Sequence, residues 1–126
     1  MKIILGLFFS LCFIIPTQVK SLEKGVWTFV KTDEYCYIGS LATDSDLSPE
    51  KNRGDNYILV YKNIGSPDTI VQIEAGYNYK LSSDIIVTID KGIYKFYTTE
   101  DLPSASWTDE DNKVIFAMKK GLELFV

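Results

Sequence analysis

The chain has 126 residues, of which 46% are hydrophobic and 24% are charged, and its formal net charge is −4. This length predicts a single domain. The acidic balance argues against a nucleic-acid partner, because neutralising phosphates takes clustered lysine and arginine. The basic pair Lys119-Lys120 is better explained as the end of a helix, where cations favour the helix dipole.

The first residues have the layout of a secretory signal peptide. Lys2 supplies a positive start, residues 3–15 are almost entirely apolar, and Pro16 ends the run. A membrane-spanning helix needs roughly 18 or more apolar residues, so the run is short for an anchor. We expect cleavage after Ser21, with an uncleaved anchor as the alternative. The sequence thus predicts a signal peptide over 1–21, which is the only membrane contact, and a domain over 22–126.

Cleavage changes both the charge and the cysteine count. The remaining 105 residues carry 11 basic against 17 acidic residues, a net charge of −6. Cys12 is lost with the signal, which leaves Cys36 alone in a compartment that usually oxidises thiols. An odd cysteine of this kind predicts a disulfide partner outside this chain. The alternative is a small buried hydrophobe.

The pattern after the signal predicts an all-β domain. Short runs rich in β-branched and aromatic residues alternate with Gly, Pro, Asn, Asp or Ser, which is typical of strands and turns. The expected strands are 26–31, 35–40, 56–62, 69–75, 85–90 and 93–98.

Two of these strands predict which side of the sheet is buried. In 69–75, Val71, Ile73 and Ala75 share one face and polar residues share the other, so one face is expected to be solvated. The run 56–62 is apolar on both faces, which predicts a central position in the sheet.

The connections are predicted from their turn residues. Asp90-Lys91-Gly92 is expected to form a three-residue hairpin loop with Gly92 at positive φ. Residues 43–55 are polar and predict a long surface loop, the kind of segment that often carries function.

One helix is expected near the C-terminus. It should begin at Thr108, with Asp111 completing a motif close to a capping box, and end before Gly121 at C′. Val114, Ile115 and Met118 recur at helical spacing and predict its buried face. The apolar run 122–126 predicts either a strand tucked into the sheet or a chain that is C-terminally incomplete, and we favour the second.

The residues for common catalytic chemistry are missing from the sequence. It contains no histidine, no Gly-x-Ser-x-Gly and no phosphate-binding loop, so we expect no enzyme, no cofactor and no metal site. Asp44-Ser45-Asp46 supplies oxygens for calcium, but no EF-hand pattern follows. Two alternatives stay open: tyrosines and Trp107 that stack on a sugar, and a pair of carboxylates in a hydrolase.

Arg53-Gly54-Asp55 spells the tripeptide that integrins recognise. It is a weak adhesion candidate, because Gly54 and Asp55 are better explained as a turn into the next strand.

The order and spacing of several short matches resemble the invasion-associated locus B family of bacterial exported proteins. The matches are Trp27, Cys36-Tyr37-Ile38, Arg53-Gly54-Asp55, Gly76-Tyr77, Tyr79-Lys80, Val87, Ile89-Asp90, Phe96, Trp107 and Ala117-Met118-Lys119-Lys120-Gly121. The resemblance implies a β-sandwich-like domain that is periplasmic or secreted, some of whose relatives assist entry into host cells. It also implies further chain after Gly121, with a terminal cysteine. This chain departs from the pattern in lacking an early cysteine and in having Ser106 before Trp107.

Together these observations predict a non-enzymatic exported interaction protein with an envelope or host-cell role and an unidentified protein or envelope partner. A module that binds carbohydrate or another small ligand is the alternative. Solvent exposure of Tyr37, Tyr77, Tyr79 and Trp107 would favour that alternative.

Overall fold

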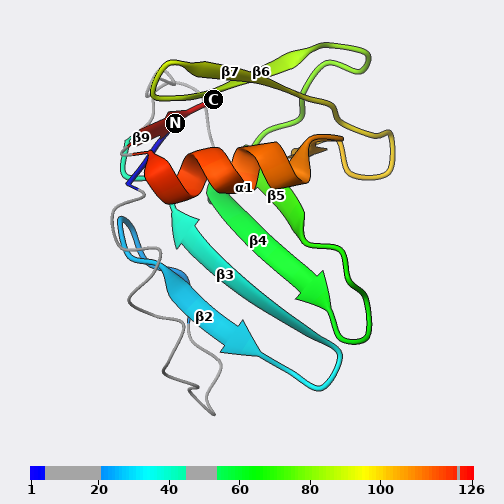
Figure 1. Cartoon of the computed structure of the whole chain (residues 1–126). Helices are drawn as coiled ribbons and strands as arrows, with labels where there is room; N and C mark the ends of the chain where they lie inside the picture. Colours follow the sequence, from blue (N-terminus) through cyan, green and yellow to red (C-terminus); the bar gives the residue numbers. More distant parts are fainter. Residues whose placement is uncertain (5–20, 45–53, 122) are drawn as a thin grey trace.

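The fold is described from a computed structural model that covers residues 1–4, 21–44, 54–121 and 123–126. Two antiparallel sheets and one helix make up the described chain (Figure 1). The elements are β1 (Lys2–Ile4), β2 (Thr28–Lys31), β3 (Tyr35–Leu41), β4 (Tyr57–Asn63), β5 (Ile70–Glu74), β6 (Ile85–Ile89), β7 (Gly92–Phe96), β8 (Ala105–Trp107), α1 (Asp111–Lys120) and β9 (Glu123–Phe125). The predicted all-β class with one short helix near the C-terminus is confirmed.

The larger sheet has five strands in the order β2-β3-β4-β5-β8. β4 lies at its centre, as its two apolar faces predict. In β5, Val71 and Ile73 are fully buried whereas Gln72 is half-exposed, so the predicted alternation is also confirmed. β8 was not expected, because three residues that include two small ones give no strand pattern.

The smaller sheet has the order β1-β9-β6-β7. β6 and β7 form the predicted hairpin, but its loop differs from the expectation. Ile89 pairs with Gly92, so the loop has two residues, and the positive φ of 50° falls on Asp90 instead of Gly92. Aspartate tolerates this conformation better than most residues. The Asp90 carboxylate also accepts a hydrogen bond from the Glu123 N–H at 3.3 Å, which ties the turn to β9.

β9 lies between β6 and β1, so the apolar run near the C-terminus is tucked into a sheet. That there is further chain stays a prediction. The two ends of the chain lie side by side (Figure 1), and the Val126 N–H donates to the Met1 carbonyl at 3.4 Å. Residues 5–20 of the predicted signal peptide lie outside the described residues. In the described part of the chain, no helix is long and apolar enough to cross a membrane.

The helix α1 crosses the inner face of the five-stranded sheet (Figure 1). Of the predicted buried face, Val114 and Met118 are buried, and Ile115 is half-buried against the core. The predicted capping box is wrong, because the N-cap is Glu110 and Thr108 lies outside the helix, where its hydroxyl donates to the Lys95 carbonyl at 2.9 Å. Gly121 is the C-cap and has an extended conformation, φ −83°, so it does not form the expected left-handed cap.

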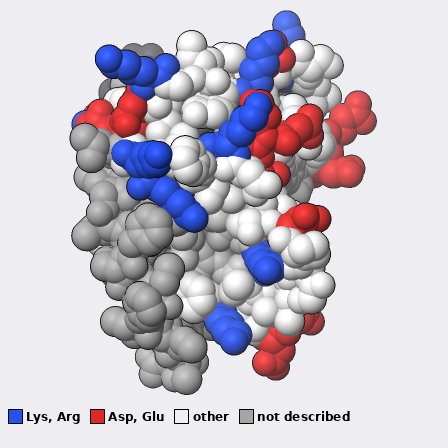
Figure 2. Space-filling view, viewed as in Figure 1, with Lys and Arg blue, Asp and Glu red and all other residues white. Residues whose placement is uncertain are grey.

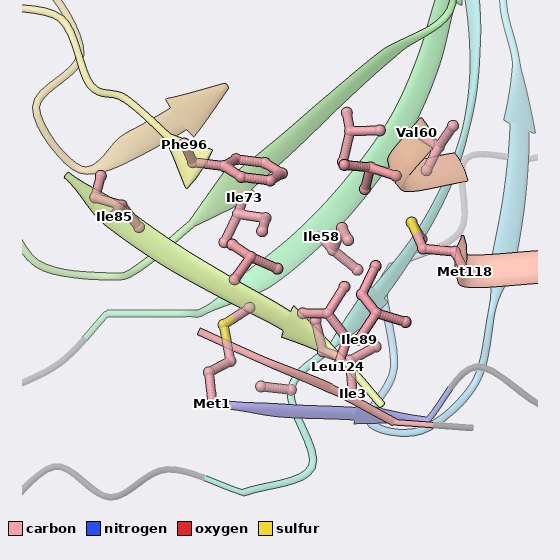
Figure 3. Packing of buried hydrophobic residues seen from close by; sticks show 14 of the residues in the cluster. Met1, Ile3, Ile58, Val60, Ile73, Ile85, Ile89, Phe96, Met118 and Leu124 are labelled. Atoms are coloured by element: carbon pink, nitrogen blue, oxygen red, sulfur yellow. The ribbon is translucent and has the colours of Figure 1, made fainter. Parts of the chain in front are cut away.

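The core fills the space between the two sheets and the helix (Figure 3). Ile58 and Ile73 of the larger sheet, Val87 and Leu124 of the smaller sheet and Met118 of the helix are all fully buried. Tyr97 and Trp107 join the two sheets, because their backbones exchange two hydrogen bonds of 2.8 and 2.9 Å. The larger sheet is therefore held against the smaller sheet both by the core and by these backbone hydrogen bonds.

Candidate functional site

The outer face of the five-stranded sheet carries a row of tyrosines. Ile58 and Val60 of β4 point into the core, so the alternating residues Tyr57, Leu59 and Tyr61 point away from it. In the register of β3 and β4, Tyr37 lies opposite Tyr61 and Gly39 lies opposite Leu59. Two neighbouring strands thus place their aromatic residues on the same side.

These residues line a shallow hollow that we call the tyrosine groove. Its volume is about 400 Å³, which is within the range of small-ligand sites. The lining residues are Leu22, Tyr35, Tyr37, Tyr57, Leu59, Tyr61, Asn63 and Gln72.

Close packing between the chain after Ser21 and β3 shapes one side of the tyrosine groove. A Cβ atom at Gly39 would lie 2.9 Å from Leu22 Cδ2 and 2.7 Å from Leu59 Cδ2. The glycine therefore leaves the space in which both leucines pack over β3. Tyr35 and Tyr37 stack beside them, with ring centroids 6.0 Å apart and planes at 20°. Tyr35 is 39% exposed and the other three groove tyrosines are half-buried.

No side chain that lines the tyrosine groove is charged, and the pKa values of two of its phenols are raised. Burial raises the pKa of Tyr37 above its ordinary value, and the neighbouring Tyr35 raises it further. Burial also raises the pKa of Tyr57, to which Glu74 and Asp55 add by repulsion. None of the eight lining residues carries a charged side chain. The groove therefore offers aromatic faces, neutral hydroxyls and two amides.

The four aromatic residues expected from the sequence separate into two places. Tyr37 lines the tyrosine groove, and Trp107 lies opposite Gln72 in the register of β5 and β8, on the same face. Tyr77 and Tyr79 instead pair with each other, edge to face at 5.4 Å, and Tyr79 packs against the core.

Sequence reasoning missed Tyr35, Tyr57 and Tyr61 as site residues. The sequence does contain a signal for them. Each is two residues away from Tyr37 or Leu59 in its own strand, so it lies on the same face of the sheet as that residue. The apolar character of both faces of 56–62 predicts a central strand, and it also places an apolar, aromatic face on the outside of the sheet.

Cys36 lies on the opposite face of the larger sheet from the tyrosine groove. It is half-buried, and it pairs in register with Lys31 on one side and Lys62 on the other. It forms no disulfide with any described residue. A disulfide to a partner outside the chain stays a prediction.

The adhesion candidate is only partly described, because Arg53 lies outside the described residues. Gly54 and Asp55 are exposed. The Gly54 N–H donates to the Gly76 carbonyl at 2.9 Å, which gives the glycine a structural role beside β4. The cell-adhesion interpretation stays a prediction.

Acidic side chains gather where α1 begins, at one side of the molecule (Figure 2). Asp68, Asp109, Glu110 and Asp111 line a hollow of about 560 Å³ there. Glu110 forms an ion pair with Lys113 at 2.8 Å, and Asp111 Oδ1 accepts a hydrogen bond from the Val71 N–H at 2.8 Å. Two of the four carboxylates, those of Glu110 and Asp111, thus make contacts within the chain.

A metal site receives no support from the described residues, because none of their His, Cys, Asp and Glu side chains form a group of three that would hold an ion. Of the calcium candidate Asp44-Ser45-Asp46, only Asp44 is described, and it is exposed.

We compared the chain with family models, with curated proteins and with solved structures, and none of the three comparisons gave a match. The resemblance to the invasion-associated locus B family therefore stays a prediction.

Proposed function

We propose that the protein is an exported, non-enzymatic binding module whose ligand is a neutral carbohydrate held in the tyrosine groove. The observation that carries this proposal is the gathering of Tyr35, Tyr37, Tyr57 and Tyr61 around Leu59 on one open sheet face. The sequence left a carbohydrate-binding module open as the alternative, but of the four aromatic residues it pointed to, only Tyr37 lines the groove.

A sugar ring matches the chemistry of the tyrosine groove. Its C–H faces are apolar and flat, so they pack on aromatic rings, which make large apolar contacts at low cost in side-chain entropy. Its hydroxyls need donors and acceptors at the rim. The amides of Asn63 and Gln72 and the tyrosine hydroxyls offer both.

The charge of the tyrosine groove favours a neutral ligand. An anionic sugar or a phosphate would need a cationic partner, and no lysine or arginine side chain lines the groove. The raised pKa values of Tyr37 and Tyr57 keep their hydroxyls protonated well above neutral pH.

Export places the tyrosine groove where glycans are found. The signal peptide predicted over 1–21 would deliver the domain to the periplasm or the medium. An envelope glycan, or a glycan on a host cell, is then the natural ligand. The envelope or host-cell role implied by the family resemblance would act through this groove.

The test is a screen of the protein against neutral oligosaccharides, followed by titration calorimetry on the best ligand. Tyr37→Ala and Tyr61→Ala should each weaken binding by about five- to thirtyfold, because each loses an aromatic contact worth about 1–2 kcal/mol. Tyr35→Ala should weaken binding as well, and Tyr77→Ala is its matched control, since Tyr77 and Tyr35 are both 39% exposed but Tyr77 lies outside the tyrosine groove.

Two outcomes would contradict the proposal. One is that no neutral sugar binds to the folded protein. The other is that Tyr77→Ala weakens binding as much as Tyr61→Ala, which would place the ligand elsewhere. Tyr61→Phe should retain most of the affinity, because it keeps the ring and loses only the hydroxyl.

A further inference from the structure

Strand β1 lies in a slot that has a backbone wall on each side. On one side β1 pairs with β9, with Ile3 opposite Leu124. On the other side the Thr43 N–H donates to the Lys2 carbonyl at 2.8 Å, and the Lys2 N–H donates to the Asp44 carbonyl at 3.2 Å. The slot therefore holds an extended segment through main-chain hydrogen bonds on both of its edges.

The side chains of β1 alternate between the core and the surface. Ile3 is fully buried and Met1 is 6% exposed, and both belong to the main core beside Leu124 and Ile89 (Figure 3). Between them, the Lys2 ammonium forms an ion pair with Glu123 at 2.8 Å. The slot thus selects an apolar, a basic and an apolar residue in succession.

The occupant of the slot coincides with the segment that the sequence predicts to be removed. The chain after Ser21 is held independently of β1, because the Gly25 N–H donates to Leu41 O at 3.5 Å and the Leu41 N–H donates to Glu23 O at 3.1 Å. The walls also have backbone contacts of their own, because Leu124 of β9 pairs with Ile89 of β6 and the Ala42 N–H, next to Thr43, donates to the Asn56 carbonyl at 2.9 Å. Loss of 1–21 therefore removes the strand but none of these contacts. The slot would then expose Leu124 and an unpaired edge of β9, an arrangement that attracts another strand.

We propose that the slot between β9 and Thr43–Asp44 is a strand-acceptor site, which β1 fills until the signal peptide is removed. A partner protein then inserts an extended segment with the pattern apolar-basic-apolar. The added strand gains main-chain hydrogen bonds from the walls, while its alternate side chains give specificity. Glu123 supplies the charge complementarity for the basic residue. The proposal rests on removal of 1–21 and not on the tyrosine groove.

The first test uses the full chain and a fluorescent probe peptide, Met-Lys-Ile-Ile followed by a Ser-Gly tail. Ile3→Asp should expel β1 from its slot and lower the Tm. The probe should then bind this variant at least about tenfold more tightly than the wild-type chain, whose slot is occupied, and should raise its Tm. Ile93→Asp is the matched control, because Ile93 is a 70% exposed isoleucine of the same sheet.

The second test is a charge reversal. A probe with glutamate in place of lysine should bind Ile3→Asp at least about fivefold more weakly, because it would face Glu123. Adding Glu123→Lys to the Ile3→Asp variant should reverse this preference. Tyr61→Ala should leave probe binding unchanged, which separates this site from the tyrosine groove.

The third test opens the slot by cleavage. A protease site introduced at Ser21, which is exposed, allows the folded full chain to be cut, and an excess of probe should then exchange with the released peptide. Equal probe binding to the wild type and Ile3→Asp, no loss of Tm in Ile3→Asp, or self-association of the cut chain in place of probe binding would overturn the proposal. If Ile3→Asp is unfolded on its own, failure of the probe to bind Ile3→Ala would overturn it as well.

Discussion

Replacement of Asp111 by alanine should lower the Tm by about 4–12 °C. The Asp111 carboxylate accepts a hydrogen bond of 2.8 Å from the N–H of Val71, a residue with no exposed surface. Without this acceptor the donor stays buried and unsatisfied, which costs about 1–3 kcal/mol. For a domain of this size, 1 kcal/mol corresponds to roughly 4 °C. Asp111→Asn keeps an acceptor oxygen and should lose much less.

The pH dependence of this contact has a definite sign. Burial raises the pKa of Asp111 above its ordinary value of 3.8; the hydrogen bond from Val71 opposes this, and repulsion from Asp109 and Asp68 adds to it. Because the pKa is higher in the folded state, the contribution to stability is fully present below the unfolded value. It is lost as the pH rises through the folded pKa. The Tm of the wild type minus that of Asp111→Asn should therefore be largest near about pH 3 and fall towards neutrality.

Thermal unfolding followed by circular dichroism at several pH values measures both effects. Asn112→Ala is the matched control, because Asn112 is exposed in the same turn of α1. Equal stability of Asp111→Ala and the wild type would refute the role of the hydrogen bond. A Tm difference that increases with pH would refute the stated direction of the pKa shift.

Two further substitutions test the packing around the two proposed sites. Leu124→Ala should lower the free energy of unfolding by about 2–5 kcal/mol in urea titrations, because Leu124 is fully buried, whereas the 44% exposed Ile86→Ala should change it by less than about 1 kcal/mol. Gly39→Ala should lower the Tm, because its Cβ would lie 3.2 Å from the Ile58 carbonyl and closer still to two leucine side chains. An unchanged Tm together with unchanged ligand affinity would show that Gly39 does not shape the tyrosine groove.

Much of the fold was predictable because its strands have a strong period of two. The alternation of Val71 and Ile73 with Gln72 predicted a half-buried strand, and the apolar character of both faces of 56–62 predicted the central one. The helix was predicted by the spacing of Val114 and Met118. Its start was not, because Thr108 finds a tertiary partner in Lys95, and a local capping motif cannot anticipate such a contact.

The candidate site was less predictable, because it depends on register. The sequence shows tyrosines at alternate positions of two strands, but only the pairing of Tyr37 with Tyr61 brings them together on one face. The slot of β1 depends on contacts between residues 2, 43 and 123, which are distant along the chain. No local pattern encodes a contact of that range.

The two tryptophans of the chain occupy contrasting environments. Trp27 is 1% exposed in the core, while Trp107 is half-buried on the outer sheet face, opposite Gln72. Their intrinsic fluorescence therefore provides two reporters in one molecule. A ligand in the tyrosine groove should alter the emission of Trp107 and leave that of Trp27 unchanged, whereas denaturation should shift both to the red. A single emission spectrum can thus distinguish occupancy of the groove from loss of the fold, with no label attached.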